Sequence, residues 1–193
     1  MKNHILVLFI LLGQMSFAQY NQLSFAEFMK LDTLDKVISL DQNFDFEMVQ
    51  TAIIQYTNKH RISKNKSILT YNVELEKWAL LHSLQMQKYD FFDHINRKEK
   101  QIRDIENRAD FVGYTNYAEL AENLYYGFVP LDNLPTYRQL AVTIVQALID
   151  SKSHNLNLLK KDLKEIGTAI VFKTKSEDGF LYYYVTQSFG TKY

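Results

Sequence analysis

The C-terminal end of the chain limits the fold most strongly, because it predicts a β-hairpin that needs covering elements. Ile166–Lys173 and Phe180–Phe189 are rich in β-branched and aromatic residues. Asp178 and Gly179 lie between these runs, and an Asp-Gly pair is typical of a tight hairpin turn. An isolated hairpin is barely stable in water. The rest of the chain must therefore supply elements that pack against these strands.

Three earlier segments have the period of amphipathic helices. The clearest covers residues 137–149, where apolar side chains fall at offsets 0, 3, 4, 7, 8, 11 and 12. Pro135 stands just before it, near the position that suits proline in a first turn. Residues 46–60 and 73–89 repeat apolar residues in the same way, and a further helical turn is expected at 156–159. Helices followed by an antiparallel pair of strands predict an α+β domain.

The middle of the chain carries weaker signals. Residues 96–110 are highly charged and predict a solvated helix or an ordered loop. Asn116 and Glu119 have the spacing of a capping box, which predicts a short helix after residue 116. Leu124–Val129 is apolar, rich in tyrosine and short enough to be a strand.

The N-terminus predicts export. Lys2 precedes an apolar run, Ile5–Leu12, that is too short to span a bilayer. Ser16 and Ala18 place small residues at −3 and −1 of a cleavage site. We therefore expect a signal peptide at residues 1–18, a lead-in segment at 19–45 and one domain at 46–193; an uncleaved N-terminal anchor is the alternative. The expected location is periplasmic or extracellular.

Composition excludes several classes of function. The chain has 22 basic and 22 acidic residues, and this balance argues against a nucleic-acid partner. It has no cysteine, which removes disulfides, thiolate metal sites and cysteine nucleophiles. The sequence contains no GxSxG, GxGxxG, HExxH or phosphate-binding glycine loop. No second long apolar run occurs, so no transmembrane segment is expected in the mature chain.

A few polar residues stand out at the expected ends of elements, where functional side chains often lie. His94, Glu122 and His154 are separated by 28 and 32 residues, so no local metal motif exists. These three residues could form a shared site, or each could have a purely structural role. His82 and Trp78 lie in a helical apolar pattern and are predicted to belong to the core, with His82 hydrogen-bonded through one nitrogen.

The chain resembles the CAP family (cysteine-rich secretory proteins, antigen 5 and pathogenesis-related 1; also called SCP-like) in its short bacterial form. The resemblance covers about residues 46–190 and rests on an ordered series of short motifs. These are Asn58–Arg61, Ala79 with His82 and Ser83, Phe92–His94, Arg108, Ala121–Asn123, Ser151–His154 with Asn157, Ile166-Gly167 and Gln187–Gly190.

The resemblance implies a three-layer α-β-α sandwich with a small antiparallel sheet flanked by helices. It also implies a surface cleft, in which His94 and His154 match the two histidines and Glu122 matches a glutamate of the family. The chain departs from the family pattern at Ala121, where a glycine is usual, and at Leu148, where a tryptophan is usual.

A second glutamate of eukaryotic members is replaced here by Ser151. Glu119, Asn123 and Ser151 are expected to line the cleft. Glu119 is a candidate for the missing carboxylate, with a capping role as its alternative. Arg108 is expected to form a structural ion pair or to clamp the backbone, with anion binding as a further option.

A set of two histidines and one glutamate suits a divalent metal such as zinc, with an open position for water. The resemblance therefore predicts a secreted binding module, rather than a conventional enzyme, whose His94, Glu122 and His154 hold a divalent metal or a small polar ligand. A lipid or a peptide is a further expected ligand. The alternatives are a metal-dependent hydrolase of peptide or cell-envelope material, and a structural or adhesive domain with a vestigial cleft.

Overall fold

The computed structural model describes residues 20–40, 44–173 and 178–193. The predicted signal peptide and its cleavage site lie outside these ranges. In chain order the elements are α2 (Phe25–Phe28), the 3-10 helix η1 (Asp32–Asp35), α3 (Phe46–Ser63), β1 (Thr70–Tyr71), α4 (Val73–Tyr89), the 3-10 helix η2 (Lys100–Ile102), α5 (Ile105–Val112), β2 (Tyr117–Pro130), α6 (Tyr137–Asp150), α7 (Lys152–Leu159), β3 (Glu165–Phe172) and β4 (Phe180–Lys192).

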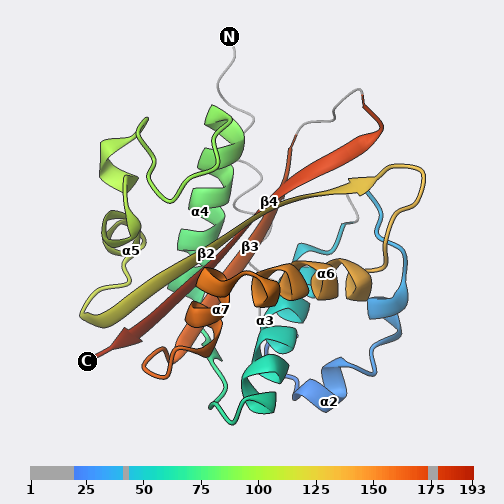
Figure 1. The fold of residues 1–193 in the computed structure, drawn as a ribbon, viewed down its shortest axis with the longest axis horizontal. Coiled ribbons are helices and arrows are strands. Elements are labelled where there is room, and N and C mark those ends of the chain that lie inside the picture. Colours follow the sequence, from blue (N-terminus) through green and yellow to red (C-terminus); the bar gives the residue numbers. More distant parts are fainter. Residues whose placement is uncertain (1–19, 41–43, 174–177) are drawn as a thin grey trace.

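Helices cover a central sheet from both sides, which confirms the predicted α+β class (Figure 1). The strand order is β1-β3-β4-β2, so β2 is an edge strand. β3 and β4 form the predicted antiparallel hairpin, and β2 pairs antiparallel with β4 along its length. The short β1 is parallel to β3, which makes the sheet mixed rather than wholly antiparallel. In the described ranges, no helix has the length and apolarity needed to cross a membrane.

The three strongest helical predictions are confirmed, and each helix has a cap that the sequence supplies. The Asp45 side chain accepts from Met48 N at the start of α3. Asn72 caps α4 in the same way, and Thr136 forms a capping box with Gln139 at α6. Such caps satisfy backbone N–H groups that have no partner within the helix. The charged segment at 96–110 becomes a loop that leads through η2 into α5.

The short helix predicted after residue 116 is wrong, because this segment begins β2. Asn116 has a positive φ of 58°, whereas a capping residue normally has extended backbone. Glu119 then pairs with Thr191 across the sheet, and its carboxylate accepts from Lys160 Nζ at 2.6 Å. Strand pairing with β4 therefore overrides the local capping pattern. The strand predicted at 124–129 is confirmed as the second half of this longer β2.

The two faces of the sheet are built differently. The large apolar cluster lies between the sheet and the layer that contains α3 and α6, and it also includes Phe28, Leu34 and Ile38 from the lead-in segment. On the opposite face, α4 and α5 cover smaller apolar clusters around Trp78 and Met86. Gly167 lets α4 approach β3 closely, since a Cβ there would collide with the backbone of Glu76. This second face carries the polar site.

Candidate functional site

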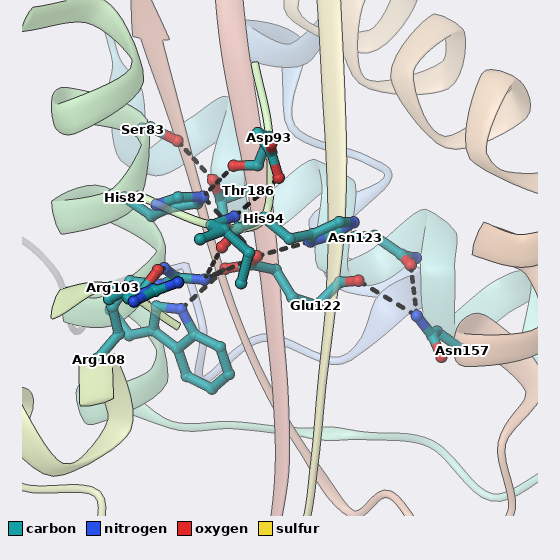
Figure 2. A network of polar contacts seen from close by, with 12 residues as sticks. His82, Ser83, Asp93, His94, Arg103, Arg108, Glu122, Asn123, Asn157 and Thr186 are labelled. Atoms are coloured by element: carbon teal, nitrogen blue, oxygen red, sulfur yellow. Dashed lines mark hydrogen bonds and ion pairs between the residues drawn. The ribbon is translucent and has the colours of Figure 1, made fainter. Parts of the chain in front are cut away.

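Glu122 on β2 is the centre of a buried polar network (Figure 2). Its side chain is almost completely inaccessible, and its oxygens have three hydrogen-bond partners, with His82 Nε2 a further 3.8 Å from Oε1. Trp78 Nε1 donates to Oε2 at 2.9 Å, and Arg108 Nη2 lies 3.0 Å from both oxygens. His94 Nδ1 lies 2.8 Å from Oε1. The carboxylate is therefore held by a tryptophan, an arginine and a histidine.

Three elements bring these partners to β2. Trp78 and His82 are four residues apart on α4, so they project from the same face of the helix. α5 supplies Arg108, which also donates to the backbone carbonyls of His94, Ile102 and Arg103. These bonds fix the loop that carries His94. Arg108 is therefore both an ion-pair partner and a backbone clamp, as predicted.

The ion pair keeps Glu122 charged. Burial raises the pKa of its carboxyl group, but the contacts with His94, His82 and Arg108 outweigh burial and bring the pKa below its ordinary value. Burial likewise lowers the pKa of Arg108, and Glu122 opposes that effect. Each charge thus compensates for the desolvation of the other.

The three histidines near this network differ in exposure and charge. His82 is completely buried, and burial lowers its pKa to about 4, so it is neutral at ordinary pH. Its Nε2 lies 3.1 Å from the Asp93 carbonyl, while its buried Nδ1 has no hydrogen-bond partner among the described residues. The prediction of a core histidine bonded through one nitrogen is confirmed.

His94 and His154 are the accessible members. The His94 side chain is 50% exposed, and its hydrogen bond to Glu122 raises its pKa. His154 stands at the start of α7 and is partly buried. Burial first, and then the charge of His94, lower the pKa of His154. The two imidazoles are therefore within electrostatic reach of each other, and neither ring is enclosed.

α7 is tied to β2 beside Glu122. Asn123 Nδ2 donates to the His154 carbonyl at 3.2 Å, and Asn157 Nδ2 donates to the Glu122 carbonyl at 3.2 Å. Asn157 also donates to Asn123 Oδ1 at 2.9 Å. The sequence alone did not indicate that Asn157 serves this role, although it belongs to the quoted family motif. These amide bonds position the histidine of α7 next to the strand that carries the carboxylate.

The three residues expected to line the cleft have other contacts as well. Glu119 forms an ion pair with Lys160. Asn123 is a buried residue of β2, and its side chain also donates to Gln187. Ser151 joins α6 to α7, and its hydroxyl lies 3.4 Å from that of Ser153. A role for these residues in ligand contact stays a prediction.

The described residues do not bring the three predicted metal ligands together as one set. Across residues 20–40, 44–173 and 178–193, no group of three or more His, Cys, Asp or Glu side chains is placed to hold a metal ion. A metal at Glu122 would have to displace the Arg108 guanidinium from the carboxylate. The imidazoles of His94 and His154 are the remaining donors. Metal binding at these residues stays a prediction.

Trp78 contacts the Glu122 carboxylate, and the sequence analysis did not predict this role. The helical pattern placed it in the core, where it is indeed completely buried. Its indole N–H also donates to Glu122, and this contact was not predicted. The sequence did contain a signal for this contact, because a buried indole N–H needs an acceptor.

Fold and site together define a class: an α+β domain with a buried glutamate on an edge strand, flanked by histidines from a loop and a helix. Residues 54–189 match the CAP family, described as the cysteine-rich secretory protein family. This match covers well over half of the chain, and the protein belongs to that family.

Solved bacterial structures share the fold. An extracellular protein of Bacillus anthracis with an SCP domain has 19% identity and a TM-score of 0.58, covering 81% of this chain and 45% of that chain. An outer surface protein of Borrelia burgdorferi has 18% identity and a TM-score of 0.57, covering 82% of this chain and 99% of that one. A cysteine-rich secretory protein of Staphylococcus aureus has 18% identity and a TM-score of 0.54, covering 80% and 40%.

The chain thus spans less than half of the B. anthracis and S. aureus proteins. At these identities the likeness concerns the fold alone. No curated protein sequence matches the chain.

Proposed function

We propose that the protein is an exported binding module that holds a small polar ligand between His94 and His154. The observation that carries this proposal is the contrast within the site. The Glu122 carboxylate is fully engaged by Trp78, Arg108 and His94, whereas the His94 side chain is 50% exposed. Ligand contact therefore falls to the imidazoles, and Glu122 acts as their anchor.

The charges of the site favour a ligand that accepts hydrogen bonds. Arg108 offsets the charge of Glu122, and the raised pKa of His94 extends the pH range in which its ring is positively charged. Nδ1 faces Glu122, so the other ring nitrogen is the one that can donate to a ligand. A small carboxylate or phosphate fits this donor best.

An NMR titration of the histidine rings tests the proposal, with sodium phosphate and sodium acetate as separate probes. We expect saturable shifts of the His94 and His154 signals at pH 6 that weaken as His94 loses its proton at higher pH. His94→Ala and His154→Ala should each abolish saturation. Lys77→Ala is the control, because Lys77 is an exposed cation on α4 that takes no part in this network. Unchanged His94 signals with both probes would refute the proposal.

A zinc titration of the same variants separates the metal-dependent alternatives. Saturable zinc binding that requires both imidazoles would make the ligand a metal. Zinc-dependent turnover of a peptide or of cell-envelope material, lost in both variants, would replace the binding module with a hydrolase. Zinc must meet neutral imidazoles, so its binding should weaken as the pH falls through the raised pKa of His94, opposite to the trend expected for phosphate.

A second candidate function, binding of an acyl chain, is favoured by a groove between α3 and α6. The groove has a volume of about 470 Å³, within the range of small-molecule sites. Its walls combine apolar side chains with a few polar ones: Tyr56, Lys59, His60, Ser63, Val142, Val145, Gln146 and Ile149. Val142 is 40% exposed on the wall, and a lysine on the lining suits a carboxylate head group.

Titration with oleate tests this second candidate. Val142→Asp places a charge in the groove and should weaken oleate binding by at least about tenfold, or 1.4 kcal/mol. Leu156→Asp changes an exposed leucine on α7 and should leave binding unchanged. Equal affinity of Val142→Asp and the unmodified protein would place oleate elsewhere.

A further inference from the structure

An uncovered aromatic surface lies at the hairpin end of the sheet, separate from the histidines. Along β2, Tyr126 and Phe128 follow Glu122 on the same side of the strand, because strand side chains alternate. The C-terminal end of β2 and the N-terminal end of β4 are paired, and they lie at the upper right of Figure 1. We call the aromatic strip the five side chains that gather here: Phe92, Tyr126, Phe128, Phe180 and Tyr182.

The rings of this strip form a continuous series. Neighbouring centroids are 5.9 Å apart from Phe92 to Tyr126, 5.7 Å from Tyr126 to Tyr182 and 5.9 Å from Tyr182 to Phe128. The Tyr126 and Tyr182 rings are nearly parallel, with planes 10° apart. Phe92, Tyr126 and Phe128 are 50%, 37% and 57% exposed. Large contiguous apolar surfaces that stay exposed in soluble proteins are frequently binding regions.

A depression of about 210 Å³ opens beside the strip and adds a polar wall. It is lined by Asp90, Phe91, Phe92, Tyr126 and Tyr184. The Asp90 carboxylate accepts from Lys173 Nζ at 2.6 Å and lies 3.5 Å from the Tyr184 hydroxyl. At the other end of the strip, the Tyr182 hydroxyl donates a hydrogen bond to Asp178 Oδ2 at 2.8 Å. Hydrogen-bonding groups thus border the aromatic rings at two places.

The backbone at Asp90 supports a role for its carboxylate. This residue ends α4 in the left-handed region, with φ 51° and ψ 58°, where glycine is the usual choice. Aspartate tolerates this region at some energetic cost. Its side chain is the polar wall of the depression, which gives a reason for aspartate rather than glycine here.

From these observations we propose that the aromatic strip and the adjoining depression bind a neutral carbohydrate chain. The C–H groups of a pyranose ring are weakly positive and stack on the negative faces of aromatic rings. Its hydroxyls can both donate and accept, which matches a carboxylate, a lysine and tyrosine hydroxyls at the border. The depression has room for one sugar ring, and the series of rings provides further stacking positions along an extended chain.

The charges of the strip favour a neutral ligand over a membrane. Asp90 is neutralised by Lys173, so the depression has no net attraction for an ion. An anionic lipid surface would be attracted by unpaired lysine or arginine side chains, whereas Lys173 is paired with Asp90 here and Asp178 adds a further carboxylate. His94 and Glu122 belong neither to the strip nor to the lining of the depression, so the inference is independent of the proposed ligand site.

Isothermal titration with cellohexaose and chitohexaose, two soluble neutral oligosaccharides, tests the inference. Tyr126→Ala and Phe128→Ala should each weaken the binding of the preferred oligosaccharide by about tenfold, or 1.4 kcal/mol. Phe111→Ala is the matched control, because Phe111 is an equally exposed aromatic residue on α5. Circular dichroism melts would verify that all variants remain folded.

Retained affinity in Phe111→Ala and His94→Ala, with loss in the strip variants, supports the inference and separates it from the histidine site. Absence of binding to both oligosaccharides overturns it. Equal weakening by Phe111→Ala also overturns it, because the ligand would then lie elsewhere. Sedimentation with vesicles of phosphatidylcholine and phosphatidylglycerol that depends on Tyr126, without oligosaccharide binding, would identify the strip as a membrane contact instead.

Discussion

Arg61 and Arg108 are both completely buried, yet they lie in different helical layers and have different partners. Arg61, near the end of α3, donates to the carbonyls of Ser67, Leu158 and Lys160. Arg108, on α5, also donates to carbonyls but adds an ion pair with Glu122. The first arginine fastens the end of α7 to α3. The second is connected, through Glu122, to the half-exposed His94.

The difference shows what turns a buried charge into part of a site. A buried cation that binds only carbonyls fixes the backbone and changes no side-chain pKa that a ligand would feel. A buried cation paired with a carboxylate sets the charge of that carboxylate, which in turn holds an accessible imidazole. Of these two arginines, only Arg108 belongs to such a chain of contacts.

Breaking the ion pair should give the largest effect. Arg108→Met removes the buried cation that pairs with Glu122 and leaves the carboxylate only its bonds to His94 and Trp78, so we expect a loss of about 3–5 kcal/mol in the free energy of unfolding. The double variant Arg108→Met/Glu122→Gln removes both charges while keeping an acceptor for Trp78, so it should be more stable than Arg108→Met alone. Urea unfolding of the two single variants and the double variant measures this coupling; strictly additive losses would contradict it.

Another buried ionisable residue extends the comparison, because no cation among the described residues is paired with it. Glu76 on α4 is 8% exposed, and among the described residues no lysine, arginine or histidine pairs with it. Burial raises its pKa from 4.5 to about 7, and the charge of Glu47 adds to the rise. Hydrogen bonds from Tyr71 and Gln50 oppose this shift.

The folded state therefore binds the Glu76 proton more tightly than the unfolded state between pH 4.5 and 7. Stability contributed by this proton is complete below pH 4.5 and is lost as the pH rises through 7, by about 3 kcal/mol in total. Glu76→Gln should remove this slope and make the protein more stable than the parent at pH 8. Thermal melts from pH 4.5 to 8 measure the slope, and an unchanged slope in Glu76→Gln would refute the assignment.

The part of the fold that depends on local pattern was predictable. Apolar periodicity identified α3, α4 and α6, and the Asp178-Gly179 pair identified the final hairpin. Two elements depended on distant partners instead. β1 has only two residues, and its parallel pairing with β3 leaves no local signature. The start of β2 carried a capping pattern that pairing with β4 overrode.

The residues of the site were predictable from the sequence, but the contacts of the Glu122 carboxylate were not. The family motifs named His94, Glu122 and His154, and the structure places His94 directly against Glu122. Sequence could not show that Trp78 and Arg108 already occupy the carboxylate, because these contacts join α4, α5 and β2 over long separations. The same holds for the aromatic strip. Strand alternation places Tyr182 and Tyr183 on opposite faces of β4, but which side chains are exposed depends on how far α4 extends along the sheet.

The smallest effect is expected at the other arginine, where no carboxylate is coupled to the charge. Arg61→Met leaves carbonyl acceptors of the α3–α7 contact without a donor, and its Nη2 already has no hydrogen-bond partner among the described residues. We expect a loss of about 1–3 kcal/mol, equal at pH 6 and pH 8 because no titrating partner is involved. The pKa of His94, followed by NMR, should stay unchanged in Arg61→Met and shift in Arg108→Met. A shift of similar size in both variants would mean that α7, rather than the ion pair, sets the charge of the imidazole, and the contrast between the two arginines would fail.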